Sequence, residues 1–174
     1  MKIKKFFYIR KLKKKFPKVV FGSNFYIENY QFLNNLYIGK YVYIGANAIW
    51  ALKGKIIIGS NVIIGPRSIF WTYNHNYESK NFIPYGGPEE DIVKNITIHD
   101  NVWIGMNVTL LPGVTVAEGA VIAANSVVTK DVPECAVVAG NPAKIIKYRD
   151  KSLFYKLKKE NKLYLKFKFN KEIK

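Results

Sequence analysis

The chain of 174 residues contains two histidines and one cysteine, which narrows the chemistry open to it. A lone Cys135 excludes an internal disulfide and a zinc cluster built on cysteines. His75 and His99 are too few for a zinc site of three histidines from one chain, so we expect no metal. The sequence shows no Ser–His–acid spacing that would indicate a covalent acyl-enzyme. Of the reactions open to a histidine, proton transfer remains possible, because an imidazole with an ordinary pKa of about 6.5 is mostly a neutral base near pH 7.

His75 is the better candidate for such a base. It lies in the segment WTYNHNYES, within a stretch of about residues 71–97 that interrupts an otherwise regular pattern. Long loops in compact domains are usually functional, so this stretch predicts a projecting loop that carries the site. His99 lies inside the regular pattern, and we expect it to be an exposed bend residue.

The regular pattern is a repeat of six residues. It reads Ile98-His-Asp-Asn-Val102-Trp, then Ile104-Gly-Met-Asn-Val108-Thr, and continues to Val132 with an aliphatic first position and a small or β-branched fifth position. The same frame fits residues 38–49 and, after a two-residue slip near Lys53-Gly54, residues 58–69. A period of six is neither that of a helix nor that of an alternating strand, so it indicates one short strand plus one bend per unit.

Three such units close a triangular coil of about 18 residues, the hexapeptide β-helix. Stacking at the strand spacing of about 4.8 Å would fill the interior with first-position residues. Gly and Asn between the strands permit left-handed backbone at the bends. The stacked pairs would be Ile98 and Val116, Ile104 and Ile122, and Leu110 and Val128. We therefore predict an all-β solenoid, a parallel β-helix of about five coils over residues 19–143.

The net charge of +16 is concentrated at the two ends of the chain. Residues 1–18 carry nine Lys and Arg and no acid, and residues 144–174 carry twelve Lys and Arg and three acids. Residues 19–143 carry seven Lys and Arg and nine acids. Basic ends suit a polyanion, and they predict peripheral contact with an anionic membrane surface unless they only confer solubility. The body has no basic patch interleaved with aromatic residues, which argues against nucleic acid.

The terminal segments have their own patterns. Residues 2–16 fit a basic amphipathic helix, and Ser152–Lys159 fits a short helix. Leu163–Phe169 alternates apolar with polar residues, which predicts a strand. No apolar run approaches the roughly 20 residues of a membrane span, and the first apolar stretch is too short for a signal peptide. We therefore expect a cytoplasmic chain, peripheral at the inner face of the membrane.

Residues 98–147, which include NVWIGMNVTLLPGVTV and NSVVTKDVPECAVVAGNPAKIIK, resemble the C-terminal half of hexapeptide-repeat sugar acetyltransferases. That family includes the maltose and galactoside O-acetyltransferases and the O-acetyltransferases of capsule and lipopolysaccharide clusters. The likeness covers roughly residues 20–148. It implies a left-handed β-helix, a homotrimer with active sites in the grooves between subunits, and acetyl-CoA as the acetyl donor.

The resemblance also implies roles for individual residues. His75 matches the family's catalytic histidine, which would remove the proton of a sugar hydroxyl as its oxygen attacks the thioester. Glu78 or a backbone carbonyl would orient the ring. Tyr73, Asn74 and Trp103 are expected on the substrate side, with Trp103 stacked on a sugar, lining the acetyl channel or packed between subunits.

Coenzyme A would lie along the outer bends of the C-terminal coils, where small residues admit it to backbone groups. Matched by motif, the expected contacts are Gly105 and Met106 in WIGMN, Ala124 in VIAANS, and Thr129 and Lys130 in VVTKD. Lys144 and Lys147 follow GNPAK and would hold the phosphates, unless they simply belong to the basic tail.

The chain departs from the small-sugar enzymes at Leu52-Lys53-Gly54, where they commonly carry an acidic turn, and at residues 1–18. These departures favour a glycan acceptor, in a capsule, lipopolysaccharide or lipid-linked precursor, over maltose or galactoside. The alternative is an N-acyltransferase that acts on an amino-sugar nucleotide with the same base. Many such enzymes add a Rossmann-like N-terminal domain, for which this chain has no room.

Overall fold

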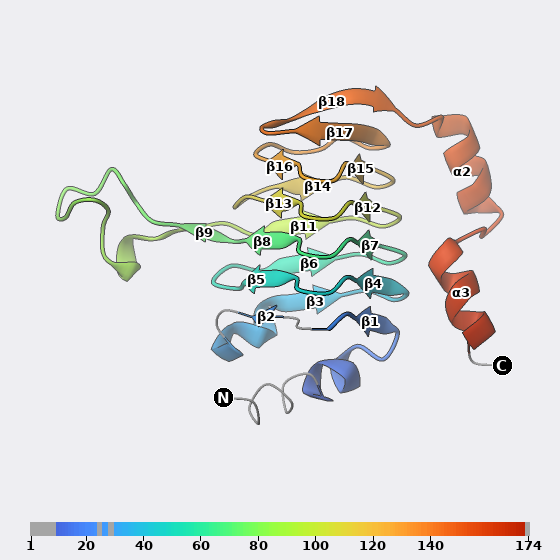
Figure 1. Ribbon diagram of the computed structural model, residues 1–174, viewed down its shortest axis with the longest axis horizontal. Coiled ribbons are helices and arrows are strands. Elements are labelled where there is room, and N and C mark those ends of the chain that lie inside the picture. The colour runs from blue at the N-terminus through green and yellow to red at the C-terminus, as the bar shows by residue number, and fades with distance from the viewer. Residues whose placement is uncertain (1–9, 24–25, 28–29, 173–174) are drawn as a thin grey trace.

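The structure is a computed structural model that describes residues 10–23, 26–27 and 30–172. Short strands wind into a parallel solenoid with three faces, drawn in Figure 1. Face 1 contains β1 (Val19–Phe21), β4 (Val42–Ile44), β7 (Ile63–Ile64), β12 (Trp103–Ile104), β15 (Val121–Ile122), β17 (Ala136–Gly140) and β18 (Ala143–Tyr148). Face 2 contains β2 (Tyr26–Ile27), β5 (Ile49–Ala51), β8 (Ile69–Trp71), β13 (Thr109–Leu110) and β16 (Val127–Val128). Face 3 contains β3 (Leu36–Ile38), β6 (Ile56–Ile58), β11 (Ile96–Ile98) and β14 (Thr115–Val116).

The predicted stacking of the six-residue units is confirmed. Ile98 lies beside Val116, Ile104 beside Ile122 and Leu110 beside Val128 in parallel register. First-position and fifth-position side chains point inward; among them Ile104, Leu110, Val108 and Ala120 are fully buried. Face 1 has six parallel strands before β18 turns back antiparallel, one more level than the five coils expected.

The bends depend on left-handed backbone, as predicted from the Gly and Asn residues. Positive φ angles occur at the fourth position of successive units, at Asn101, Asn107, Gly113, Gly119 and Asn125. Asparagine tolerates this conformation better than most side chains, and it adds hydrogen bonds between coils. Asn107 Nδ2, for example, donates to Asn125 Oδ1 at 2.8 Å.

The N-terminal end of the solenoid is covered by the segment before β1. Residues 10–15 are helical, and Leu12 and Phe16 are buried in the core. The rest of the amphipathic helix expected over residues 2–16 lies outside the described residues. A short 3-10 helix, η1 (Tyr30–Asn35), leads into β3.

The C-terminal end folds back along the corner between faces 3 and 1. The predicted helix is confirmed as α2 (Lys151–Lys159), which begins where the Asp150 carboxylate accepts the Leu153 N–H at 3.0 Å. The basic tail expected from residue 144 starts inside β18, so its first residues belong to face 1. Figure 1 shows α2 and α3 beside β7, β12 and β15.

The strand predicted over Leu163–Phe169 is wrong, because the structure has a helix there, α3 (Tyr164–Glu172). A strand would place Leu165, Phe167 and Phe169 on one side. Instead Leu165 is buried and Phe169 contacts the Tyr41 ring at 5.8 Å, which is i, i+4 spacing, whereas Phe167 is 58% exposed. Packing of one helical stripe on the solenoid outweighs the alternating pattern.

Candidate active site

A two-stranded hairpin projects from the end of β8, at the corner between faces 2 and 3 (Figure 1). Its strands are β9 (Tyr73–Asn74) and β10 (Ile92–Val93), and the loop between them contains the short helix η2 (Pro88–Glu90) just before β10. Asn74 pairs with Ile92 in antiparallel register. The next residue on each strand is therefore His75 on one side and Asp91 on the other. The predicted projecting loop is present, and this register places an acid opposite its histidine.

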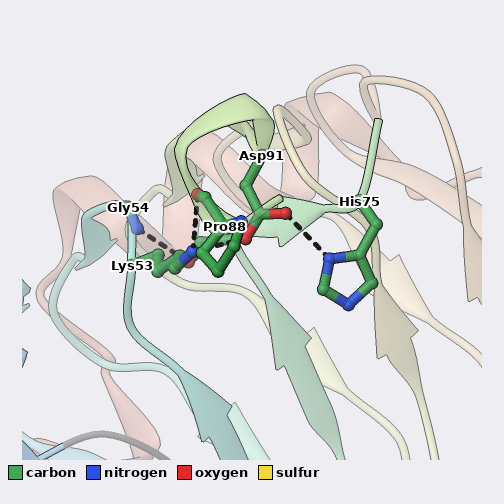
Figure 2. A network of polar contacts seen from close by, with 6 residues as sticks. Lys53, Gly54, His75, Pro88 and Asp91 are labelled. Carbon is green, nitrogen blue, oxygen red and sulfur yellow. Dashed lines mark hydrogen bonds and ion pairs between the residues drawn. The ribbon is translucent and has the colours of Figure 1, made fainter. Parts of the chain in front are cut away.

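His75, Asp91 and Lys53 form one polar network, shown in Figure 2. His75 Nδ1 lies 2.8 Å from Asp91 Oδ1, and Lys53 Nζ donates to Asp91 Oδ2 and, at 3.3 Å, to the Pro88 carbonyl. The Asp91 side chain is 2% exposed, whereas that of His75 is 44% exposed. A buried acid thus holds a histidine whose ring still reaches solvent.

The charge state of Asp91 fixes the tautomer of His75. Burial alone would raise the Asp91 pKa, but the hydrogen bonds and charges of Lys53 and His75 outweigh it and lower the pKa below its ordinary value. An ionised carboxylate only accepts hydrogen bonds, so Nδ1 of His75 carries the proton. The lone pair then lies on Nε2, which Figure 2 shows on the side of the ring away from Asp91. That arrangement suits a general base.

Two tyrosines fix the plane of the imidazole. The Tyr85 ring stacks on His75 at 4.1 Å between centroids and 7° between planes, and the Tyr73 ring meets its edge at 5.9 Å. Lys53 Nζ in turn lies 5.0 Å from the centre of the Tyr73 ring. Glu90 braces the loop outside this cluster by accepting from Asn76 and Asn81. The imidazole is therefore held by contacts on several sides rather than by one bond.

The orienting residue was not among those expected from the sequence. Glu78 is exposed, and its N–H donates to Asn76 Oδ1, while Asp91 contacts the His75 ring. Asp91 is identified by the pairing of β9 with β10. Strands of two residues are too short to show a periodic pattern in the sequence. Lys53, noted only as a departure from an acidic turn, proves to be the partner of Asp91.

The expected substrate residues lie in two places. Tyr73 and Asn74 form β9 directly before the histidine, and the Asn74 side chain is exposed. Trp103 lies on β12 of face 1 and is 55% exposed. Figure 1 shows β9 running out from the opposite side of the solenoid from β12. A single chain therefore does not bring His75 and Trp103 together.

The expected coenzyme A contacts occupy three parts of the surface. Gly105, Met106 and Ala124 stack at the corner between faces 1 and 2, where a Cβ on Gly105 would come within 2.6 Å of the Ala124 nitrogen. The Gly105 N–H already donates to the Ile122 carbonyl and is not available to a ligand. The glycine therefore contributes to a binding site only through its small size. The remaining residues are all exposed: Thr129 and Lys130 follow β16, and Lys144 and Lys147 lie on β18.

The other chemically active side chains fall outside this network. His99 is exposed, as predicted for a bend residue. Cys135 is fully buried, and burial together with the nearby Glu134 raises the pKa of its thiol. Among the described residues, no three His, Cys, Asp or Glu side chains gather as a metal ion would require. No helix in the described part of the chain is long and apolar enough to cross a bilayer.

The lowered pKa of Asp91 predicts a pH-dependent contribution to stability. A carboxylate with a depressed folded-state pKa stabilises the fold above its unfolded pKa of about 3.9, and the effect is lost as pH falls through the folded value. Asp91→Asn should therefore cost about 2 kcal/mol at pH 7. The difference from the wild type should shrink steadily below about pH 4. Thermal unfolding of both proteins across pH measures it.

Glu78→Gln is the matched control, because it removes an exposed carboxylate from the same loop. It should change stability by less than about 0.5 kcal/mol. An Asp91→Asn deficit that stayed constant down to pH 2 would mean that the lost free energy is not tied to the ionised carboxylate.

Comparison with known proteins adds to this geometry. Residues 95–130 match the family model described as bacterial transferase hexapeptide (six repeats). The chain is 35% identical over 144 residues to the galactoside O-acetyltransferase of Escherichia coli, a match that covers 78% of this chain and 68% of that protein. A hexapeptide-repeat acetyltransferase from Vibrio cholerae, solved with acetyl coenzyme A, superimposes with a TM-score of 0.67 and 37% identity over 75% of this chain and 68% of that one.

Other curated relatives are longer than the matched region. Two fungal proteins, from Saccharomyces cerevisiae and Schizosaccharomyces pombe, are 38% and 41% identical to 66% and 65% of this chain. The match spans 56% and 53% of their lengths, a little over half. The repeat, the parallel solenoid and these similarities agree: the chain belongs to the hexapeptide-repeat acetyltransferases and has their left-handed β-helix fold.

Proposed function

We propose that the protein transfers acetyl from acetyl-CoA to a hydroxyl of a sugar in a surface glycan, such as a capsule, a lipopolysaccharide or a lipid-linked precursor. The observation that carries the proposal is the His75–Asp91 pair on an exposed hairpin, which presents an oriented imidazole. The E. coli relative acts on galactosides by name, and the V. cholerae relative binds acetyl coenzyme A. Both support a sugar acceptor and a thioester donor.

The reaction would proceed by direct transfer. The acceptor oxygen attacks the thioester carbonyl carbon while its proton moves to Nε2 of His75. A C–O bond forms, the C–S bond breaks, and the proton passes from Nε2 to the departing sulfur. Asp91 stabilises the imidazolium that exists between the two proton transfers, because it is ionised and buried beside the ring.

The test is release of coenzyme A from acetyl-CoA in the presence of purified candidate glycans. Release that depends on one glycan, with mass spectrometry showing one added acetyl group, would support the proposal. Hydroxylamine treatment separates the two chemistries, because it cleaves an O-acetyl ester and leaves an N-acetyl amide intact. An amide formed on an amino-sugar nucleotide would establish the N-acyltransferase alternative instead.

Coenzyme A is proposed to lie along the corner formed by Gly105, Met106 and Ala124. The close stacking of Gly105 on Ala124 keeps large side chains from these two positions, and the exposed ammonium groups of Lys130, Lys144 and Lys147 suit its phosphates. Thr129 adds a hydroxyl beside Lys130.

A homotrimer is proposed because the expected site residues leave opposite sides of one chain. In a cyclic trimer, His75 of one copy meets Trp103 of the next. If so, mixing two inactive variants should restore activity. In trimers assembled at random from His75→Ala and Trp103→Ala copies, a site is intact when one copy supplies His75 and the next supplies Trp103. This holds for about a quarter of the sites. The expected turnover of the refolded mixture is therefore about a quarter of the wild-type value.

The controls are each variant refolded alone and the two mixed without unfolding. Light scattering should give the mass of three chains. A monomeric mass, or a refolded mixture no more active than the mean of the two variants, would contradict the shared site.

Peripheral contact with the cytoplasmic face of an anionic membrane is proposed for the C-terminal helices. On α3, the Phe167 side chain is 58% exposed beside several lysines. Each lysine near such a surface contributes about 1 kcal/mol. The protein should sediment with phosphatidylglycerol vesicles at low salt and leave them at high salt. Lys166→Glu with Lys171→Glu should abolish sedimentation.

The matched control is Lys55→Glu with Lys80→Glu, which makes the same charge change at exposed positions of the body. It should leave vesicle binding largely unchanged. Equal loss in both double variants would indicate general charge attraction, and a protein that stays in the supernatant at low salt would exclude the contact.

A further inference from the structure

A cavity of about 320 Å³ lies between face 1 and the start of α3, on the side of the solenoid away from the hairpin. Its lining includes Trp103 from β12, Tyr164 from α3 and Arg149 from the segment that joins β18 to α2. These three side chains come from distant parts of the sequence. Arg149 and Tyr164 of the C-terminal extension complete the cavity, so it is not a product of the repeat alone.

Two exposed aromatic rings belong to this lining. Trp103 is 55% exposed and Tyr164 is 63% exposed, although both side chains are largely apolar. Ligand cavities combine such apolar surfaces with a few placed polar groups. Indole and phenol faces suit the C–H faces of a pyranose ring, and their N–H and O–H groups can bond its hydroxyls.

Arg149 supplies the charged group. Its NH1 donates to the Gly119 carbonyl at 3.0 Å, and its guanidinium lies 5.1 Å from the centre of the Phe154 ring. These contacts hold the guanidinium plane in place. Among the described residues, no carboxylate lies within ion-pair distance of Arg149. Because a guanidinium has five N–H donors, a fixed fork remains for an anion with paired oxygens.

A ladder of side-chain amides holds the cavity in shape. Asn61 Nδ2 donates to Asn101 Oδ1 at 2.8 Å, and Asn101 Nδ2 donates to Glu118 at 2.7 Å. The Leu165 N–H donates to Asn61 Oδ1 at 3.2 Å, and the Leu165 side chain is buried. These contacts anchor the backbone beside Tyr164 before any ligand arrives, which lowers the entropy lost on binding.

The surrounding charge favours an anion. The one carboxylate of the ladder, Glu118, also pairs with Lys158 at 2.7 Å, so its charge is balanced. Residues 144–174 carry twelve bases and three acids. The C-terminal segment that supplies Arg149 and Tyr164 to the lining is thus strongly basic, and a net positive charge of this kind raises the local concentration of anionic ligands.

We infer that this cavity binds a sugar residue that carries a carboxylate or a phosphate, with its ring against Trp103 and Tyr164 and its anionic group on Arg149. The inference rests on the proposed sugar acetyltransfer, for which the cavity is an acceptor subsite, and it names the substrate class as an acidic glycan. Since His75 of the same chain leaves the opposite side of the solenoid, the base that serves a sugar bound here comes from another copy.

The test is a binding titration without acetyl-CoA, using matched pairs of probes: cellobiouronic acid against cellobiose, and glucose 1-phosphate against glucose. The chain has three tryptophans, so NMR of the indole N–H groups reports directly, with Trp103 assigned from Trp103→Phe. The anionic member of at least one pair should bind about tenfold more tightly than its neutral partner and should shift the Trp103 signal. The pair that shows this distinguishes carboxylate from phosphate.

Variants separate the charge from the rings. Arg149→Gln should weaken the anionic probe about tenfold and change the neutral probe less than about twofold. Tyr164→Ala should weaken both probes. Lys156→Gln is the matched control, since it removes one exposed charge from α2, outside the cavity lining, and should change either affinity less than about twofold. If Arg149→Gln does not fold, Arg149→Lys keeps the charge without the planar fork and should give an intermediate loss.

Equal affinity for charged and neutral probes, an unshifted Trp103 signal, or equal losses in Arg149→Gln and Lys156→Gln would overturn the subsite. Coenzyme A release measured on the same preparations keeps the two proposals apart. Turnover with a neutral glycan and no binding here would overturn the subsite alone, whereas binding here without turnover on any glycan would overturn the proposed reaction alone.

Discussion

Replacement of His75 by alanine should lower kcat by about 10²-fold or more while the protein stays folded and binds coenzyme A normally. The imidazole is the group that takes the acceptor proton in the proposed step, and its side chain is 44% exposed on a projecting hairpin. Removing it therefore leaves the solenoid core intact. Steady-state release of coenzyme A, with circular dichroism on the same samples, measures the effect.

Asp91→Asn provides a graded comparison. An amide in place of the carboxylate can donate to Nδ1 and leave the proton on Nε2, which is the wrong tautomer for a base. We therefore expect kcat to fall, but by less than in His75→Ala. His99→Ala is the matched control, because it removes an exposed histidine from a bend. Turnover of His75→Ala within a few-fold of the wild type would remove this residue from the mechanism.

Phe70→Ala should destabilise the protein by about 3–5 kcal/mol. The ring is fully buried in β8 and stacks on Trp50 at 4.2 Å between centroids and 14° between planes. Deleting it leaves a cavity in a solenoid interior that cannot easily collapse, since each coil is fixed by the coils above and below. Thermal unfolding should show a melting temperature about 10 °C or more below that of the wild type.

Phe70→Leu should recover much of this loss because it refills most of the volume. Phe167→Ala, at an exposed position of α3, is the matched control and should shift the melting temperature by no more than about 2 °C. A Phe70→Ala protein as stable as this control would show that the Trp50–Phe70 stack is not part of the cooperative core.

The solenoid could be predicted closely from the sequence because its repeat encodes both the strand and the bend. Each unit specifies an inward residue, Ile104 for example, and a left-handed bend residue, Asn107 for example, so register follows once the period is found. The C-terminal segment carries no such repeat. There the alternation of Leu165 with Lys166 suggested a strand, and only contact with the solenoid selects the helix.

The candidate site was predictable in part. His75 stood out because few other side chains of the chain could act as a base, and because the repeat breaks around it. Asp91 and Lys53 did not, since the first depends on a two-residue strand pairing and the second reaches the network from the preceding coil. Contacts that the irregular insertion makes within itself and with the coils leave no spacing rule in the sequence.

Hydrogen bonds close the hairpin where its two strands leave the solenoid. The Lys94 N–H donates to the Thr72 carbonyl at 2.9 Å, and the buried Thr72 hydroxyl bonds the Ala51 carbonyl and the Gly54 N–H. β8 and β11 therefore keep their places whatever lies between residues 72 and 94. Such an insertion can change in length and sequence at little cost to the coils, because closing a longer loop adds only about 0.6 kcal/mol per doubling. Acceptor preference can in this way diverge among proteins that share one unaltered scaffold.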